Sequence, residues 1–387
     1  MGSDRSAEVV LKEIESAFSE LAHIDLTGLT EGEVAEAAIC AQRVRSMADA
    51  ACQRTAGALE ASQAWVSDGA RSATAWLAWR CKVPRARASA AVVGARSLRS
   101  MPRVETALLA GDVTTDHARL LAYAQATAPD AFAADGEARL LAAAAVLSFR
   151  QFETAVRYWR HLHAPDAVED EARHRRQGRR LHCSRSFDAM VVLDAMLDPI
   201  GGAIVVRELE RLERELFDED LAEARERLGR AEVAVTDLWR TPAQRRADAL
   251  QRMAERSAAK PAGAVEPRIL LNVLAGHESV DRMCELSNGD VVTPGEVLPL
   301  LDRADVERAI FDGASKVIDL GVRRRLFTGA TREAVKFRDR HCVGNGCEIP
   351  AERCEVDHIV RYADGGLTIQ SNGRCLCKYH HRRARPG

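Results

Sequence analysis

Two short stretches near the end of the chain combine the residue types that bind metal ions. HCVGNGCEIP carries Cys342 and Cys347 with four residues between them, and CKYHH carries Cys377 followed by His380 and His381. The glycines between the first two cysteines allow the backbone to turn tightly around an ion. Two thiolates from such a turn, with one thiolate and one imidazole from a helix, form the tetrahedral Cys3His site of a structural zinc ion. We therefore predict that zinc staples this end of the chain.

The spacing within CKYHH leaves the choice of histidine open. In a helix over 377–383, His380 lies three residues and His381 four residues after Cys377, so either shares its face. Adjacent helical residues point about 100° apart, so the histidine that does not bind zinc faces elsewhere. Cys354 and Cys375 are the alternative thiolate ligands, although we expect Cys354 to pack as a small apolar residue before a strand.

The stretch CEVDHIVRYADGG, residues 354–366, adds groups that a structural zinc ion does not need. Its Asp357 and His358, with the C-terminal histidine that does not bind zinc, provide one carboxylate and two imidazoles. This combination suits a second, catalytic divalent ion beside a general base that activates water. The alternative is a surface or capping pair, because an Asp-His pair by itself is ordinary.

Composition describes an ordinary globular protein, with 47% hydrophobic and 29% charged residues among 387. At roughly 100–200 residues per domain, we expect two domains. Five of the ten cysteines fall within residues 342–377, which in a reducing compartment indicates metal binding rather than disulfides. The N-terminus has no apolar secretory segment, and the longest apolar run, 140–147, is too short to span a membrane. We expect a cytoplasmic protein that does not enter a membrane.

Charge is unevenly distributed along the chain. Residues 323–387 contain 14 Lys and Arg against 7 Asp and Glu, a net charge of +7, so the rest must carry −9 to reach the total of −2. A basic end suggests a polyanion partner, although uneven surface charge alone would look the same. The candidate phosphate contacts in this segment are Arg323, Arg324, Arg325 and Arg361.

The first 180 residues have the pattern of consecutive helices. Thr30 and Glu33 form a capping box ahead of a long run in which Ala, Leu, Val and Met recur at helical spacing. Pro84 opens another helix near its first turn. Short breaks at Pro102 and Pro129 divide the remainder of this helical region.

Later segments mix strands with helices. Residues 187–198 contain a core that is typical of a buried strand, and apolar residues at 205, 209, 212 and 216 form one face of a charged helix. Residues 257–267 have the composition of a linker, 268–275 the pattern of a strand, and 314–328 that of a short hairpin.

These patterns predict a mainly α-helical fold in three parts: an N-terminal helix or leader at 1–29, a helical domain at 30–322 and a small C-terminal domain at 323–387. His117 is expected near a helix start. The scattered cysteines are expected in the core, where free thiols usually pack: Cys40, Cys52, Cys81, Cys183 and Cys284.

The C-terminal residues resemble a known pattern. FRDRHCVGNGCEIPAERCEVDHIVRYADGGLT and NGRCLCKYHH are similar to the HNH endonuclease motif, in the version at the end of actinobacterial DUF222 proteins, also called the 13E12 repeat family. Upstream, GARSATAWLAWRCKVPRARASAAVVGARSLRSMPRVETALLAGDVTTDHARLL and VIDLGVRRRLFTGATREAVKFRD are similar to the helical DUF222 region. The resemblance covers roughly residues 30–387 and implies a large helical region followed by a zinc-stapled ββα-metal module.

The resemblance also implies a role for each residue of the motif. His358 would be the general base that activates water to attack a DNA phosphodiester, and Asp357 and His381 would hold one catalytic Mg²⁺ or Mn²⁺ ion. Asn372 would hydrogen-bond the backbone and fix the loop that orients His358. The ligands of the structural zinc would be Cys342, Cys347, Cys377 and His380.

We therefore expect a metal-dependent HNH endonuclease that acts on DNA. The sequence departs from the family pattern at Asp357, where many relatives have His, at Gly373 and Arg374, where relatives place apolar residues, and at the additional Cys375. The alternative is a non-catalytic, zinc-stabilised DNA-binding protein whose helical region binds a partner. The presence of Asp357, His358 and Asn372 favours the enzyme. A homodimer would supply two sites, but no sequence feature marks its interface.

Overall fold

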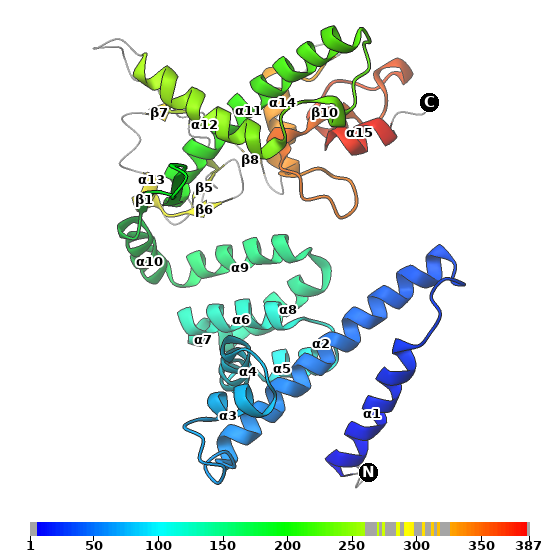
Figure 1. The fold of residues 1–387 in the computed structure, drawn as a ribbon, viewed down its shortest axis with the longest axis vertical. Coiled ribbons are helices and arrows are strands. Elements are labelled where there is room, and N and C mark those ends of the chain that lie inside the picture. Colours follow the sequence, from blue (N-terminus) through cyan, green and yellow to red (C-terminus); the bar gives the residue numbers. More distant parts are fainter. Residues whose placement is uncertain are drawn as a thin grey trace. The chain divides into compact units, whose positions relative to one another are not determined.

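A computed structural model describes residues 6–259, 269–270, 273–274, 284–286, 290–297, 304–305, 311–312, 316–317 and 326–384 (Figure 1). The chain divides into two compact units, Met1–Phe149 and Arg150–Gly387, and each is described by itself. The mainly helical fold predicted from the sequence is confirmed, with a few small sheets in the second unit. The predicted domain boundary at 322/323 falls outside the described residues and stays a prediction.

In the described part of the first unit, all regular secondary structure is helical. They are α1 (Ala7–Ala22), α2 (Glu31–Ser62), α3 (Ala73–Arg80), α4 (Arg85–Leu98), α5 (Pro102–Leu109), α6 (Thr115–Thr127), α7 (Pro129–Ala131), a π-helical turn (Phe132–Gly136) and α8 (Glu137–Val146). Aliphatic and aromatic side chains from α5, α6 and their neighbours fill the core, among them Met101, Val104, Leu108, Leu121 and Phe132, which are at most 1% exposed.

The helix starts agree with the predicted signals. Thr30 and Glu33 form the capping box of α2, and Pro84 is the N-cap of α4. His117 lies in the first turn of α6, where its backbone N–H donates to the Thr114 hydroxyl (3.4 Å) and its ring accepts from the Thr114 backbone N–H (3.3 Å). The prediction of a helix start at His117 is therefore confirmed, and capping accounts for this side chain.

α3 and α4 are joined by only four residues, 81–84. The pair packs on α2 through a small apolar cluster that includes Ala73, Leu77 and Val92. Lys82 in the connection has a φ of +53°, in the left-handed region that glycine adopts most easily. The turn is thus tight, and it leaves the end of α3 and the start of α4 beside each other.

The second unit begins with α9 (Phe149–His163), α10 (Pro165–Gln177), the antiparallel strands β1 (Arg180–Arg185) and β2 (Val191–Met196), α11 (Pro199–Leu228), a 3-10 turn (Val235–Asp237) and α12 (Pro242–Ala258). α11 and α12 lie side by side (Figure 1) and bury Leu212, Leu216 and Ala249 between them. The apolar face predicted on α11 is confirmed at these two leucines. No helix among the described residues is both long enough and apolar enough to cross a bilayer.

Two predictions of burial are wrong. The strand at 191–193 exists, but every residue of β1 and β2 is exposed, because a lone hairpin has two faces and neither packs on another element in the part of the chain described. Cys40, Cys52, Cys81 and Cys183 are exposed rather than in the core, while Cys284 is buried as expected. Helical periodicity places a cysteine on a face but does not say which face is covered.

Short strands occupy the middle of the second unit. β3 (Ile269–Leu270) pairs in parallel with β7 (Ala304–Asp305); β4 (Val273–Leu274), β5 (Cys284–Leu286) and β6 (Val291–Val292) form an antiparallel sheet that α13 (Pro294–Val297) follows; and β8 (Phe311–Asp312) pairs with β9 (Lys316–Val317). The strand predicted at 268–275 thus appears as β3 and β4. Most of the predicted linker lies outside the described residues. The hairpin predicted at 314–328 is described only at β9 and at 326–328, so it stays a prediction.

The C-terminal segment consists of α14 (Gly329–Asp339), a knuckle loop, β10 (Glu355–His358), β11 (Gly373–Leu376) and α15 (Lys378–Ala384), with 3-10 turns at Ala351–Arg353, Tyr362–Asp364 and Gln370–Asn372. β10 and β11 pair antiparallel, with Asp357 opposite Arg374 and His358 opposite Gly373. A Cβ added to Gly373 would lie 2.6 Å from the Val335 side chain and 2.9 Å from Phe327. Glycine at this position therefore allows β11 to approach α14 closely.

Candidate metal centre

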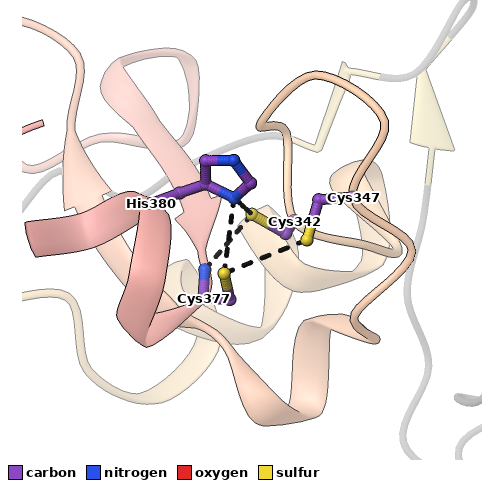
Figure 2. A group of neighbouring side chains, drawn as sticks. All are labelled: Cys342, Cys347, Cys377 and His380. Atoms are coloured by element: carbon purple, nitrogen blue, oxygen red, sulfur yellow. Dashed lines mark hydrogen bonds between the residues drawn. The ribbon is translucent and has the colours of Figure 1, made fainter. Parts of the chain in front are cut away.

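The four residues predicted for zinc lie together beside α15 (Figure 2). Their ligand atoms all lie within 4.8 Å of one another. His380 Nδ1 is 3.3 Å from Cys342 Sγ and 3.4 Å from Cys377 Sγ, and Cys347 Sγ is 3.9 Å from Cys377 Sγ. A zinc ion with tetrahedral bonds of about 2.3 Å to sulfur and about 2.0 Å to nitrogen requires separations of roughly 3.5–3.8 Å. The cluster therefore fits a metal ion such as zinc.

The knuckle loop is shaped by backbone hydrogen bonds and by two glycines. Cys342 N–H donates to the Ile349 carbonyl (2.8 Å), and Cys347 N–H donates to the Gly344 carbonyl (3.0 Å). A Cβ on Gly344 would come within 2.4–2.5 Å of the His380 ring, so only glycine lets the loop reach that ligand. Gly346 has a φ of +66°, where a side chain is disfavoured.

The pKa of one ligand thiol, Cys377, is shifted in the opposite direction from those of the two alternative cysteines. Burial opposes ionisation of Cys377, but hydrogen bonds from His380, Cys342 and Cys347 lower the pKa of its thiol to about 7. Burial raises the pKa of Cys354 and of Cys375, which keeps both thiols neutral. Neither thiol belongs to the group of four ligand atoms that lie within 4.8 Å of one another, so the alternative ligands considered from spacing are not supported. Cys354 and Cys375 instead belong to the small buried core of this segment.

The structure separates the two adjacent histidines. His380 faces the three sulfurs, whereas His381 faces β10. His381 Nδ1 is 2.7 Å from Glu355 Oε2, and His381 Nε2 is 3.7 Å from Asp357 Oδ1. The Glu355 carboxylate therefore fixes the ring so that Nε2 points towards Asp357, as carboxylates do for metal-binding histidines.

His358 lies next to Asp357 on β10, with its ring 4.5 Å from that of Phe327. Its Nε2 is 2.9 Å from the Thr368 hydroxyl. Burial lowers the pKa of His358, and the Asp357 carboxylate opposes this only in part. The imidazole is therefore held in its neutral form, in which one ring nitrogen can accept a proton.

Asn372 joins the two ends of the loop between β10 and β11. Its side-chain carbonyl accepts from Val360 N–H (2.8 Å), and its amide donates to the carbonyls of Val360 (3.0 Å) and Leu367 (2.8 Å). A Cβ on Gly366 would lie 1.8 Å from the Val360 carbonyl oxygen, so the loop closes tightly there. The predicted hydrogen bonding of Asn372 to backbone is thus present, immediately after His358.

A cavity of about 500 Å³ opens beside these groups. It is lined by Asp357, His358, Ile359, Val360, Arg361, Asp364, Arg374 and Ala384. Two arginines reach it, but both are engaged: Arg361 pairs with Asp364 (2.6 Å) and Arg374 pairs with Asp357 (3.2 Å). Arg323, Arg324 and Arg325, the other predicted phosphate contacts, lie outside the described residues.

Three positioning groups were missed from the sequence. Glu355 and Asp357 are two residues apart on a strand and so share one face, a signal that strand periodicity could have provided. Thr368 carries no local signal, because only the folded loop brings it to His358. Arg338 donates to the carbonyls of Gln370 and Gly373, both at 2.6 Å, and so ties α14 to the start of β11.

Comparison with known proteins identifies one family. The profile described as "Domain of unknown function (DUF222)" matches residues 31–339 and ends three residues before Cys342. Three Mycobacterium tuberculosis proteins share shorter segments: Uncharacterized protein Rv3776 (45% identical over 49 residues, 13% of this chain and 9% of that protein), Uncharacterized protein MT1160 (32% over 103 residues, 26% and 24%) and Uncharacterized protein Rv2100 (43% over 49 residues, 13% and 9%). The chain thus spans at most 24% of the length of these relatives. No solved structure matches.

Proposed function

The chain belongs to the DUF222 family, and on that premise we propose that its C-terminal segment is an HNH-type endonuclease that hydrolyses DNA phosphodiester bonds. The observation that supports this most directly is that Asp357 and His358 line one cavity and that His381 Nε2 lies 3.7 Å from Asp357 Oδ1. One carboxylate and two imidazoles are the groups that metal-assisted hydrolysis needs. The neighbouring Cys3His cluster would hold zinc as a structural ion.

Asp357 and His381 are the residues that would hold a catalytic Mg²⁺ or Mn²⁺ ion. Such an ion would supply charge stabilisation for the phosphate and the leaving oxygen. Glu355 fixes the tautomer of His381 by accepting from Nδ1, which leaves Nε2 with a lone pair towards Asp357. The two side chains come from β10 and α15, so the pairing of those elements sets their separation.

His358 would act as the general base. If its Nε2–H donates to the Thr368 hydroxyl, Nδ1 carries the lone pair that removes a proton from the attacking water. Burial lowers the pKa of His358 and so favours the neutral, proton-accepting ring. Asn372 holds the following loop in place and so would limit the movement of His358.

The experiment is cleavage of supercoiled plasmid with Mg²⁺ or Mn²⁺ by the full chain and by His358→Ala, with zinc content measured on both. General-base catalysis contributes about 10²–10⁴-fold, so the variant should lose at least a hundredfold in rate while retaining its zinc. His182→Ala, an exposed histidine on β1, is the matched control and should cut normally. A zinc-loaded full chain that cuts with neither ion contradicts the proposal.

One observation favours the non-catalytic alternative, a zinc-stabilised DNA-binding protein. Arg374 donates to Asp357 Oδ2 at 3.2 Å, so a cation already neutralises the carboxylate that would bind the catalytic ion. If Arg374 competes with that ion, Arg374→Gln should lower the Mn²⁺ concentration needed for cleavage. An Arg374→Gln chain that binds DNA but still does not cut would support the alternative.

A further inference from the structure

The longest stretch of the chain without an acidic residue lies in the first unit, and it is strongly basic. Residues 69–104 contain eight basic residues and no acidic one, a net charge of 8 − 0 = +8. The C-terminal segment needs residues 323–387 to reach +7. The eight are Arg71, Arg80, Lys82, Arg85, Arg87, Arg96, Arg99 and Arg103. Seven of them lie on or beside α3 and α4, and Arg103 lies in the first turn of α5.

Five residues at the turn between these helices form a continuous exposed stretch, which we call the α3–α4 basic surface. All five side chains belong to residues that are exposed, and Trp79 is 60% exposed. The guanidinium of Arg80 lies over the rings of Trp76 (5.8 Å) and Trp79 (5.4 Å), which holds it at the surface. The members are Trp79, Arg80, Lys82, Arg85 and Arg87.

Most of this charge is not neutralised by the residues that the structure describes. Arg96 and Arg99, further along α4, pair with Glu60 of α2, and Arg87 approaches Asp49 only to 3.8 Å. Arg80, Lys82 and Arg85 make no ion pair with any residue that the structure describes. The α3–α4 basic surface therefore presents at least three uncompensated cations within six residues.

Lys82 and Arg85 are residue types that the local backbone conformation disfavours at their positions. Lys82 adopts a φ of +53°, where glycine is favoured and lysine is strained. Arg85 lies in the first turn of α4, which has no side-chain cap and where the helix dipole disfavours a cation. Neither residue is explained by folding, since both are exposed and buried packing comes from Ala88 and Val92 instead. An anion bound at the surface would compensate both costs.

We infer that the α3–α4 basic surface is a second binding site for DNA, separate from the C-terminal cavity, and that its ligand is the phosphate backbone of a duplex. Two packed helices joined by a four-residue turn resemble the helix-turn-helix arrangement, in which residues at the start of the second helix reach the duplex. The exposed Trp79 beside the cations could pack against sugars at the edge of the groove. This site goes beyond the proposed nuclease and does not depend on it.

The test measures duplex binding by the full chain carrying His358→Ala, so that cleavage of the DNA does not interfere with the measurement. The triple variant Arg80→Ala/Lys82→Gly/Arg85→Ala is compared with Arg119→Ala/Arg139→Ala, two exposed arginines of the same unit that already pair with Asp116 and Asp135. Each lost phosphate contact lowers the slope of log K against log salt by about 0.9, so the triple variant should lose roughly 3 in slope and at least about tenfold in affinity. The control should match the parent.

Equal affinity and slope for the triple variant and its parent would overturn the inference. So would an equal loss on single-stranded DNA, because that result would assign the surface to any phosphate chain rather than to a duplex. Lys82→Gly alone guards against misfolding: glycine suits the backbone there, so this variant should fold normally and still lose about one unit of slope. If the triple variant loses duplex binding and the full chain never cleaves plasmid, the result supports this site and contradicts only the proposed nuclease.

Discussion

The C-terminal metal segment and the helical first unit each contain a basic region, but they are stabilised in different ways. The buried cluster of the metal segment is small, and half of its residues are cysteines: Phe327, Val335, Cys342, Ala351, Cys354, Cys375, Leu376 and Cys377. The first unit instead buries large apolar side chains such as Met101, Leu121 and Phe132. In the metal segment the zinc ligands Cys342 and Cys377 are therefore also part of the core, whereas in the first unit the charged surface is independent of the core.

Loss of the zinc ligands is the largest change that this comparison predicts. Structural zinc contributes about 10 kcal/mol or more to folding of small metal domains, and the cluster at 342–380 has little else to replace it. Cys377→Ser, or chelation, should therefore remove hydrogen-exchange protection from β10, β11 and α15 while leaving α2 to α6 protected. Cys40→Ser, at an exposed cysteine of α2, is the control and should change neither. Protection retained in β10 and β11 without metal would break the comparison.

A core truncation in the first unit should give the reverse pattern. Leu108 is 0% exposed, so Leu108→Ala should cost about 2–5 kcal/mol in the free energy of unfolding of that unit. Urea denaturation read on the first unit tests this, with zinc content expected to stay unchanged. Val146→Ala, at a residue 81% exposed, should have almost no effect. Zinc released by Leu108→Ala would show that the two regions are not independent.

The buried carboxyl of Glu285 predicts that the unfolding free energy of the second unit depends on pH. Burial raises the pKa of this carboxyl to about 7, although Arg340 pairs with it at 3.0 Å. Because the folded pKa lies above the unfolded value of 4.5, the contribution to stability is complete below pH 4.5 and is lost as the pH rises through 7. The loss amounts to about 3 kcal/mol. Glu285→Gln should flatten this part of the pH profile in urea denaturation, and an unchanged profile would contradict the assignment.

The smallest effect that we expect is a change in stability at Lys82 in the first unit. It tests whether this lysine is present for its charge or for the fold. Lysine at a φ of +53° costs roughly 1 kcal/mol relative to glycine, so Lys82→Gly should raise the unfolding free energy by about that amount. Thermal denaturation of the full chain measures it. Gly111→Ala at a φ of +74° is the converse control and should destabilise. A destabilised Lys82→Gly would mean that the lysine supports the fold and is not kept only for its charge.

The sequence predicted the metal segment better than the helical unit, for a physical reason. Metal ligands must occur at short spacings, so Cys342, Cys347 and the CKYHH stretch were recognisable, and His380 remained ambiguous only because i+3 and i+4 share a helix face. Capping residues act locally as well, which is why Thr30 and Pro84 marked true helix starts. Interactions between residues within one or two helical turns can thus be predicted from the sequence alone.

Burial, and contacts between residues far apart in the chain, could not be predicted from the sequence. Cys40 and Cys52 lie at exposed positions of α2, and Val192 on β2 lies in a hairpin that no described layer covers. Thr368 reaches His358 only because Asn372 folds the intervening loop. Sequence periodicity identifies the side of an element but not its neighbour, so these positions required the structure.

The contacts of Arg340 limit where the metal segment can be separated from the rest of the chain. This residue comes directly after α14 with a φ of +59°, and its carbonyl accepts from Ala351 N–H at 2.9 Å. Its side chain reaches Glu285 on β5 and lies 5.9 Å from the ring of Tyr158 on α9. A cassette cut at residue 341 would leave these partners behind. Recombination, in nature or in the laboratory, should therefore transfer this segment intact only when the breakpoint falls ahead of α9.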